Sequence, residues 1–153
     1  MITLAFYKGR ASNPWHRFQD GVIRRVTGGV YSHVELIAGS ASLGAEHLCL
    51  SASGRDGGVR AKVLTLKPAH WDLVELINPQ SSAVRFIRDR IGARYDYRGL
   101  ILSQVFALGR HSADRWFCSE ICAAALGLPN PQRLSPQMLF DVVTWNDDRM
   151  IWR

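Results

Sequence analysis

The sequence predicts an α+β fold in a single domain spanning residues 1–153, and three observations lead to this class. Five segments with the residue types and alternation of β-strands lie in the first half of the chain. Helical patterns dominate the second half. A chain of 153 residues, 47% of them hydrophobic, is long enough to bury one core and too short for two. We therefore expect an antiparallel central sheet packed against helices.

The N-terminal half supplies the predicted sheet. Residues 2–7 (ITLAFY) are predicted as the first strand. Asn13 as N-cap and Pro14 at the first helical position predict an amphipathic helix over residues 13–26. Its apolar positions are Trp15, Phe18, Val22 and Val26. Further strands are predicted at residues 31–38, 47–52, 59–66 and 72–77, and we interpret these four as an antiparallel meander.

The C-terminal half supplies the predicted helices. They are expected at residues 81–92, 98–109 and 118–129. Gly92 closes the first of them and Gly127 closes the third. Ser135 and Pro136 open a last helix, and residues 148–153 are expected to return as an edge strand.

The charge distribution argues against a nucleic-acid partner. The chain carries 19 Lys and Arg against 13 Asp and Glu, but these basic residues are scattered and Arg24-Arg25 is the only adjacent pair. An anionic cell envelope is the alternative partner for a formal charge of +6. No apolar run reaches the roughly 18 residues of a membrane span, and the first residues lack a secretory-signal pattern. We expect no stable membrane insertion and a chain that is cytoplasmic as synthesised.

The three cysteines suggest one reactive thiol. Cys49, Cys118 and Cys122 are an odd number without the spacing of a zinc site, so we expect neither a disulfide framework nor a metal. Cys118 stands where an irregular segment meets a predicted helix, and Ile121, Cys122 and Ala125 follow it as one buried stripe. The N–H groups and dipole at a helix start favour a thiolate, so Cys118 is the candidate nucleophile. Cys122 is expected in the core.

A thiolate nucleophile also needs a proton acceptor, and His33 is the candidate. In the segment YSHVEL, Val34 and Leu36 alternate with His33 and Glu35, so imidazole and carboxylate share one face of the predicted strand. His33 and Cys118 are 85 positions apart, and only the fold could bring them together. The alternative is a surface thiol and an unrelated histidine.

Two segments resemble the papain-like NlpC/P60 domains. Residues 92–125 (GARYDYRGLI…WFCSEICAAAL) resemble their beginning, where a Gly-x-x-Tyr segment precedes an aromatic-x-Cys-Ser at the nucleophile helix. Residues 31–60 (YSHVELIAG…LCLSASGRDGGVR) look like their later part. Here the histidine precedes the cysteine, as in the circularly permuted branch that includes YiiX-like amidases and lecithin:retinol acyltransferase relatives. The resemblance implies a permuted papain-like fold without a cofactor, with Cys118 as nucleophile and His33 as general base and acid.

The residue that orients the imidazole is left open. The resemblance places Ser51 at that position, although a serine orients a ring weakly. Glu35 is preferred, because it lies on the face of His33 and its negative charge would stabilise an imidazolium. Glu46 and His47 are further alternatives, as is a backbone carbonyl or a water molecule.

Two tyrosines are candidates for the oxyanion site. Tyr95 resembles the family's tyrosine near the nucleophile, and it or Tyr97 would donate to the oxyanion beside the backbone N–H of Cys118. Alternatively, both tyrosines pack at the interface between sheet and helices.

The resemblance implies a cysteine-dependent hydrolase that cleaves an amide bond of a peptidoglycan stem peptide through a thioester. A lipid-directed thiol esterase or acyltransferase is the competing enzyme, and its membrane-facing patch would come from Trp71, Phe140, Trp145 and Trp152. A non-catalytic phage-tail or secretion-apparatus component is a third hypothesis. The chain would reach the periplasm or cell envelope by lysis, by injection or through a delivery protein, and an immunity protein is a further expected partner.

Overall fold

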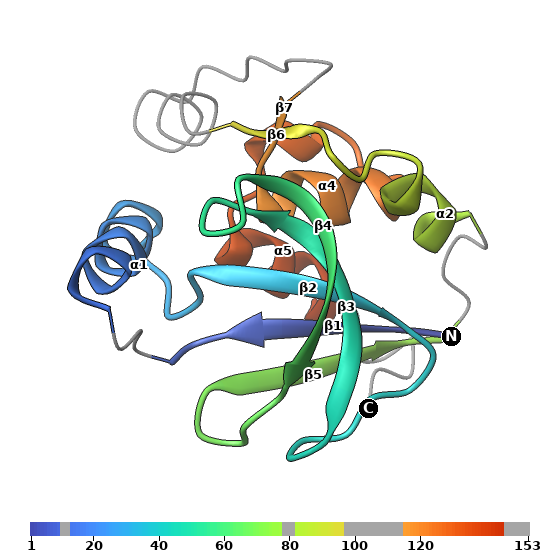
Figure 1. Ribbon diagram of the computed structural model, residues 1–153, viewed down its shortest axis with the longest axis horizontal. Helices are drawn as coiled ribbons and strands as arrows, with labels where there is room; N and C mark the ends of the chain where they lie inside the picture. Colours follow the sequence, from blue (N-terminus) through green and yellow to red (C-terminus); the bar gives the residue numbers. More distant parts are fainter. Residues whose placement is uncertain (10–12, 78–81, 97–114, 146–153) are drawn as a thin grey trace.

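The computed structural model describes residues 1–9, 13–77, 82–96 and 115–145, and within them the fold is mixed α+β (Figure 1). The strands are β1 (Ile2–Tyr7), β2 (His33–Ala38), β3 (Glu46–Ser53), β4 (Gly58–Thr65), β5 (Trp71–Leu76), β6 (Arg94–Tyr95) and β7 (Arg115–Trp116). The helices are α1 (Pro14–Thr27), α2 (Ala83–Arg88), α4 (Cys118–Ala125) and α5 (Pro136–Thr144), with the short 3₁₀ helix η1 (Pro131–Arg133).

The sheet contains all five predicted strands, with boundaries within two residues of those expected. The strand order is β5-β1-β2-β3-β4-β6-β7. The predicted meander is therefore confirmed for β2, β3 and β4 and wrong for β5, which pairs with β1 and not with β4. The two-residue strands β6 and β7 were not predicted, because two residues are too few to show an alternation.

The position of β5 requires a curled sheet. Four strand spacings, roughly 19 Å in a flat sheet, separate β4 from β5 in the order. Leu66 forms backbone hydrogen bonds with Gly44 and Ala45 at the open end of the β3–β4 hairpin. Only four residues later, the His70 backbone oxygen accepts a hydrogen bond from Lys8, which follows β1. Four residues of chain span at most roughly 14 Å, so the sheet must bend to bring its distant strands together. Figure 1 shows the result, with β3 and β4 crossing β1 and β5 steeply.

Apolar side chains pack on both faces of this sheet. On one face, Leu4, Leu36 and Leu50 pack with residues of α2, α4 and α5 in the larger core. The opposite face carries a smaller cluster, made by Ala5, Ile37, Cys49, Leu66 and Trp71. The stripe predicted on α4 is confirmed, because Ile121, Cys122 and Ala125 all belong to the larger core. This packing fixes α4 against β2 and β3.

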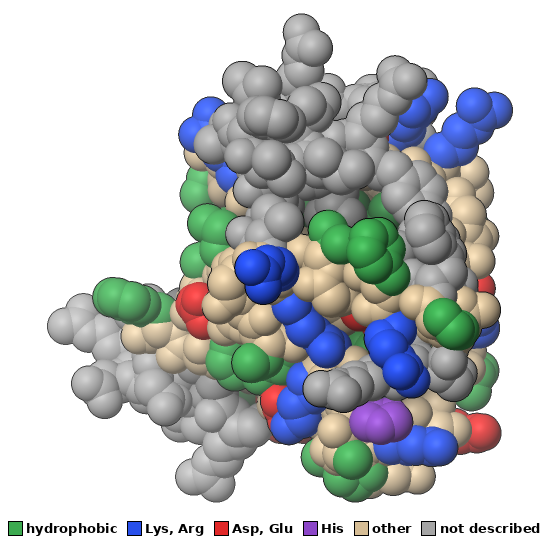
Figure 2. Space-filling model, turned by 90° about the vertical axis from the view of Figure 1, so that its left-hand side faces the viewer, with side chains coloured by type: hydrophobic (Ala, Val, Ile, Leu, Met, Phe, Trp, Pro, Cys, Tyr) green, Lys and Arg blue, Asp and Glu red, His purple; other side chains and the backbone are tan. Residues whose placement is uncertain are grey.

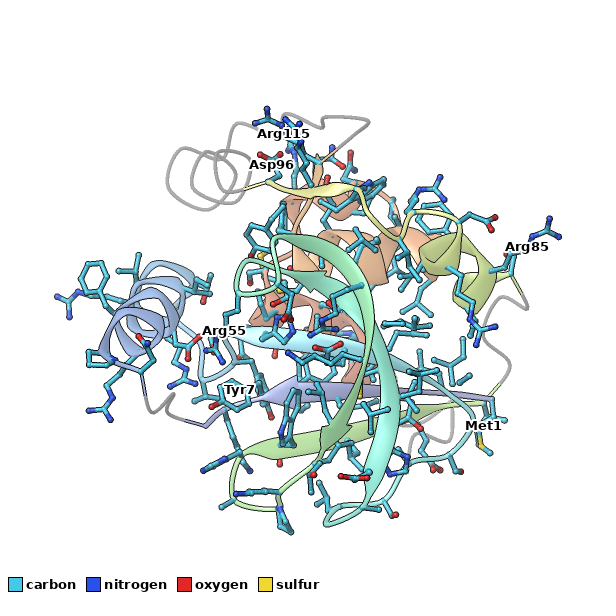
Figure 3. The ribbon with its side chains drawn as sticks, viewed as in Figure 1. Met1, Tyr7, Arg55, Arg85, Asp96 and Arg115 are labelled. Carbon is cyan, nitrogen blue, oxygen red and sulfur yellow. The ribbon has the colours of Figure 1, made fainter. Side chains whose placement is uncertain are left out.

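Helix α1 has nearly the predicted span, and among its described side chains the one that is buried, Asp20, is polar. Asp20 is 6% exposed and pairs with Arg55 of the β3–β4 turn at 2.8 Å. Figure 3 shows Arg55 reaching toward α1 from that turn. Arg24 donates a hydrogen bond to Ser32, whereas Phe18 is 62% exposed. Ion pairs and hydrogen bonds thus attach α1, and among the described residues neither core includes one of its side chains.

The predicted helices of the second half are present where the structure describes them. α2 ends at Arg88, before the expected Gly92, because the chain turns and the Gly92 N–H donates to Val59 of β4. At α5, the Ser135 hydroxyl accepts a hydrogen bond from the backbone N–H of Met138, as an N-cap does. Residues 98–109 and 148–153 lie outside the described residues. In the described ranges, no helix is long and apolar enough to cross a membrane.

Candidate active site

Cys118 is the first residue of α4, as predicted. Trp116, the last residue of β7, pairs with Tyr95 of β6, and the extended Phe117 then turns the chain into the helix. The Glu120 carboxylate accepts a hydrogen bond from the Phe117 backbone N–H at 3.4 Å, which supports the turn. The Cys118 side chain is buried, with 1% of the residue exposed. The strand-to-helix turn therefore fixes the thiol at the end of α4 where backbone N–H groups lack helical partners.

The first residue of β2, His33, brings the other predicted group to this thiol. Its Nε2 lies 2.7 Å from Oε1 of Glu35, two residues along the same strand. An ionised carboxylate can only accept, so Nε2 carries the proton of this hydrogen bond. The Cys118 thiol lies close enough to the ring to raise the pKa of His33 through its charge and as a hydrogen-bond partner, and Nδ1 is the nitrogen that Glu35 does not engage. The structure thus brings together three predicted residues, Cys118, His33 and Glu35.

These neighbours favour the protonated form of His33. Burial would lower the pKa of the ring, but negative charge at Cys118 and Glu35 and the hydrogen bonds to both raise it. The pKa of His33 is raised from 6.5 to about 10 as a result. The imidazole is therefore held as an imidazolium next to a sulfur atom that can carry the opposite charge.

Glu35 is a buried carboxylate with a cation on its far side. Its side chain is 0% exposed, and Arg60 of β4 donates to both of its oxygens, at 2.7 and 2.5 Å. Burial would raise the pKa of Glu35, whereas the Arg60 hydrogen bonds and the charge of His33 lower it. Glu35 is therefore ionised, and it accepts charge-assisted hydrogen bonds from both sides.

Arg60 is itself held from the turn between β3 and β4. Its Nε donates to Asp56 at 3.0 Å, and Lys62 pairs with the other Asp56 oxygen at 2.9 Å. The pKa of Asp56 is lowered to about 2: burial opposes this shift, and the hydrogen bonds from Lys62, Arg60 and Ser53 produce it. A row of contacts therefore runs from the surface at Lys62 inward to Glu35.

The other candidates for the orienting residue lie elsewhere. The Ser51 hydroxyl donates to the Val34 backbone oxygen at 2.7 Å, and Ser51 is also a hydrogen-bond partner of Cys122. The His47 ring bonds to the backbone of Ser42 at 3.1 Å, and Glu46 is exposed at the start of β3. Among these candidate residues, Glu35 is the one that hydrogen-bonds to the His33 ring.

The other two cysteines are packed in the hydrophobic cores, Cys122 in the larger and Cys49 in the smaller. Cys122 is fully buried in the larger core, as predicted, and burial raises the pKa of its thiol well above the usual value. Burial likewise raises the pKa of Cys49 to about 12. Neither thiol is a side-chain hydrogen-bond partner of His33.

Of the two predicted oxyanion residues, only Tyr95 is described. It is half-buried on β6, directly opposite Trp116, and it packs against the larger core. This position lies beside the segment that leads into Cys118, and it also fits the alternative of a packing tyrosine. Tyr97 lies outside the described residues.

Comparison with protein-family models and with curated proteins finds no match for this chain. The function must therefore be argued from the chemistry of the site. No group of three or more potential metal ligands gathers within the described ranges. This cluster offers a thiol, Cys118, beside an imidazole, His33, that can accept and donate a proton. The buried carboxylate of Glu35 fixes the orientation of the imidazole ring.

Sequence reasoning missed Arg60. A fully buried carboxylate requires a counter-charge, and this requirement was the signal that could have prompted a search for a cation. The partner could not be identified from spacing, because it lies on the second strand after β2, opposite Ser51 in the β3–β4 register.

Proposed function

We propose that the chain is a cysteine-dependent amide hydrolase with a permuted papain-like fold of the NlpC/P60 type. One observation carries the proposal: the His33 ring contacts the Cys118 thiol and, through Nε2, the buried carboxylate of Glu35. A thiol, an imidazole and an orienting anion in this order are the parts of a nucleophilic cysteine site. The order of the elements, with the histidine strand before the cysteine helix, supports the permuted form of the fold.

In the proposed reaction, the Cys118 thiolate attacks the amide carbonyl carbon and a tetrahedral oxyanion forms. N–H groups at the start of α4 would stabilise this negative charge. The C–N bond then breaks, the His33 imidazolium gives its proton to the leaving nitrogen, and a thioester remains. Neutral His33 next takes a proton from water, which attacks the thioester. Breaking the C–S bond releases the carboxylic acid product and restores the thiolate–imidazolium pair.

The proposed substrate is a peptidoglycan stem peptide, following the family resemblance. The charge of the chain supports an anionic target: Figure 2 shows Lys and Arg side chains gathered on the face from which α1 projects. Exposed basic residues on or near α1 include Lys8, Arg17 and Arg25. A positive surface raises the rate of encounter with a negatively charged cell wall. A delivery protein would bring the chain to this substrate.

A second candidate, a lipid-directed thiol esterase or acyltransferase, is favoured by the outer face of α5. Met138 and Val142 are 47% and 46% exposed, and Trp145, which follows the helix, is 84% exposed. Their spacing places them on one side of the helix. Of the other expected patch residues, Trp71 is buried, Phe140 is partly buried in the larger core, and Trp152 lies outside the described residues.

Incubation with purified peptidoglycan fragments, followed by mass analysis of the products, tests the proposal. Cleavage between stem-peptide residues by the wild type and not by Cys118→Ala is the expected result. Release of fatty acid from phospholipid vesicles under matched conditions would instead support the second candidate. Lack of turnover on both substrates, with an unreactive Cys118, would favour a non-catalytic assembly component.

A further inference from the structure

Six side chains form a row in which basic and acidic groups alternate at each contact. From the surface inward, Lys62 and Asp56 are in contact at 2.9 Å, and Asp56 and Arg60 at 3.0 Å. Arg60 then contacts Glu35, Glu35 contacts His33, and His33 contacts Cys118. The exposed fraction of the side chain is 51% at Lys62, 15% at Arg60 and 0% at Glu35. The row thus leads from solvent to the proposed nucleophile.

We propose that Arg60 is a positioning residue for His33, which acts by holding Glu35 charged and aimed at the ring, and that Asp56 holds Arg60 in turn. The inference rests on the proposed function, in which Cys118 and His33 are the reacting groups. Arg60 touches neither of them and acts only through Glu35.

Charge balance explains why the site needs this arginine. With the thiolate and imidazolium formed, Arg60, Glu35, His33 and Cys118 carry +1, −1, +1 and −1, which sum to zero. In the thioester, His33 and Cys118 are both neutral, and Arg60 with Glu35 again sums to zero. Without Arg60, the buried group would carry −1 in both stages, and desolvation would favour protonation of Glu35. A protonated Glu35 would no longer stabilise the imidazolium.

The geometry favours arginine over lysine at this position. The guanidinium uses its two terminal nitrogens on the two oxygens of Glu35 and its Nε on Asp56. A planar fork with three fixed donors sets the plane of the carboxylate and therefore the direction of its bond to Nε2 of His33. A lysine ammonium supplies the charge without the fixed directions.

Asp56, which holds Arg60, belongs to neither hydrophobic core. It lies in the turn between β3 and β4 with 27% of its side chain exposed, so Asp56→Asn should leave the fold intact. The neighbouring Arg55 provides a matched control. It lies in the same turn and also pairs with a carboxylate, Asp20 of α1, at 2.8 Å, but it does not belong to the row.

The test uses the alkylation rate of Cys118, which requires no knowledge of the substrate. Rates with iodoacetamide between pH 4 and 10 would be measured by peptide mass mapping for the wild type, Arg60→Met, Arg60→Lys, Asp56→Asn and Arg55→Met. The charged groups that face His33 are Cys118 of α4 and Glu35 of β2. Those that face Glu35 are His33 and Arg60, with Cys49 and Cys122 nearby.

In Arg60→Met, the rate at pH 6 should fall by about tenfold or more, and the midpoint of the profile should move up by about one pH unit or more. Arg60→Lys should restore part of the rate, Asp56→Asn should show a smaller shift in the same direction, and Arg55→Met should match the wild type. A purely structural Arg60 would lower the melting temperature without moving the profile of the folded fraction.

Two failures can be told apart. If wild-type Cys118 reacts no faster than Cys49 and Cys122, the proposed function fails. If wild-type Cys118 is selectively reactive but Arg60→Met keeps the wild-type profile, only the positioning role is overturned. Should Arg60→Met not fold, unchanged profiles in both Arg60→Lys and Asp56→Asn overturn it equally.

Discussion

Replacing Glu35 by glutamine keeps the shape of the side chain and removes its charge. In the wild type, the two carboxylate oxygens accept three hydrogen bonds from cationic donors, at 2.7 Å from His33 and at 2.7 and 2.5 Å from Arg60. A glutamine offers one acceptor oxygen and one NH₂ group, so at least one donor of Arg60 or His33 would face another donor. The substitution therefore removes both the negative charge and the full set of hydrogen bonds to Arg60 and His33.

The size of the effect follows from the complete burial of Glu35. Removing one partner of a buried ion pair costs about 3–5 kcal/mol of stability, because the other charge is left without compensation. The pKa of His33, about 10 in the wild type, should fall, since the Glu35 charge and hydrogen bond both raise it. Turnover should drop by about 10²-fold or more, which is what general acid–base catalysis contributes.

The measurements are an NMR titration of the His33 imidazole, a urea denaturation curve and the rate on the identified substrate. Ser51→Ala is the matched comparison. It removes the hydrogen bonds of the Ser51 hydroxyl to the Val34 backbone oxygen, at 2.7 Å, and to Cys122, and should cost about 2 kcal/mol with little loss of rate. An unchanged His33 pKa and rate in Glu35→Gln would refute the orienting role. Near wild-type behaviour in both variants would leave a Cys118–His33 dyad.

Three further predictions concern reactivity, folding and pH. Brief alkylation of the native protein at neutral pH, followed by peptide mapping, should label Cys118 ahead of Cys49 and Cys122. All three cysteines are at most 1% exposed, so a difference in labelling would reflect the reactivity of the thiols and not their exposure. Cys118→Ala should remove turnover and keep a wild-type circular dichroism spectrum, whereas Cys122→Gln should destabilise the core by a few kcal/mol in urea denaturation. The raised pKa of His33 means that the folded chain holds a proton that the unfolded chain releases between pH 6.5 and about 10. This contribution is fully present below pH 6.5 and is lost as the pH rises toward 10, so melting temperatures should fall over that window, and fall less in His33→Gln.

Local spacing predicted the parts of the site that lie close together in the chain. Residues two apart on a strand share a face, and this rule placed Glu35 beside His33. The start of a helix was recognisable from the pattern after Cys118. Arg60 depends instead on the register of β3 against β4 and on the route of the chain between β2 and β3. Such a contact across three strands leaves no periodic signal in the sequence.

The error in the strand order has a similar origin. The alternation that identifies β5 is the same whether it pairs with β4 or with β1. The pairing depends on how the sheet curls and on how β5 packs, with Trp71 in the smaller core and Val74 and Leu76 in the larger one. The exposure of Phe18 and Val22 on α1, at 62% and 42%, is another case, since their hydrophobic spacing is regular while Asp20 and Arg24 attach the helix to the rest of the fold.

The candidate site therefore has two parts that are held by different means. His33, Glu35 and Arg60 lie on strands of one sheet, where register and ion pairs fix them to one another. Cys118 is fixed by the packing of α4 on β2 and β3 and by the short pairing of β7 with β6. Loosening that packing would withdraw the thiol while leaving the imidazole oriented, so the distance between Cys118 and His33 depends mainly on how firmly α4 is held. Substitutions at Ile121 or Ala125 should consequently change the alkylation rate of Cys118, whereas the pKa of Glu35 should change less.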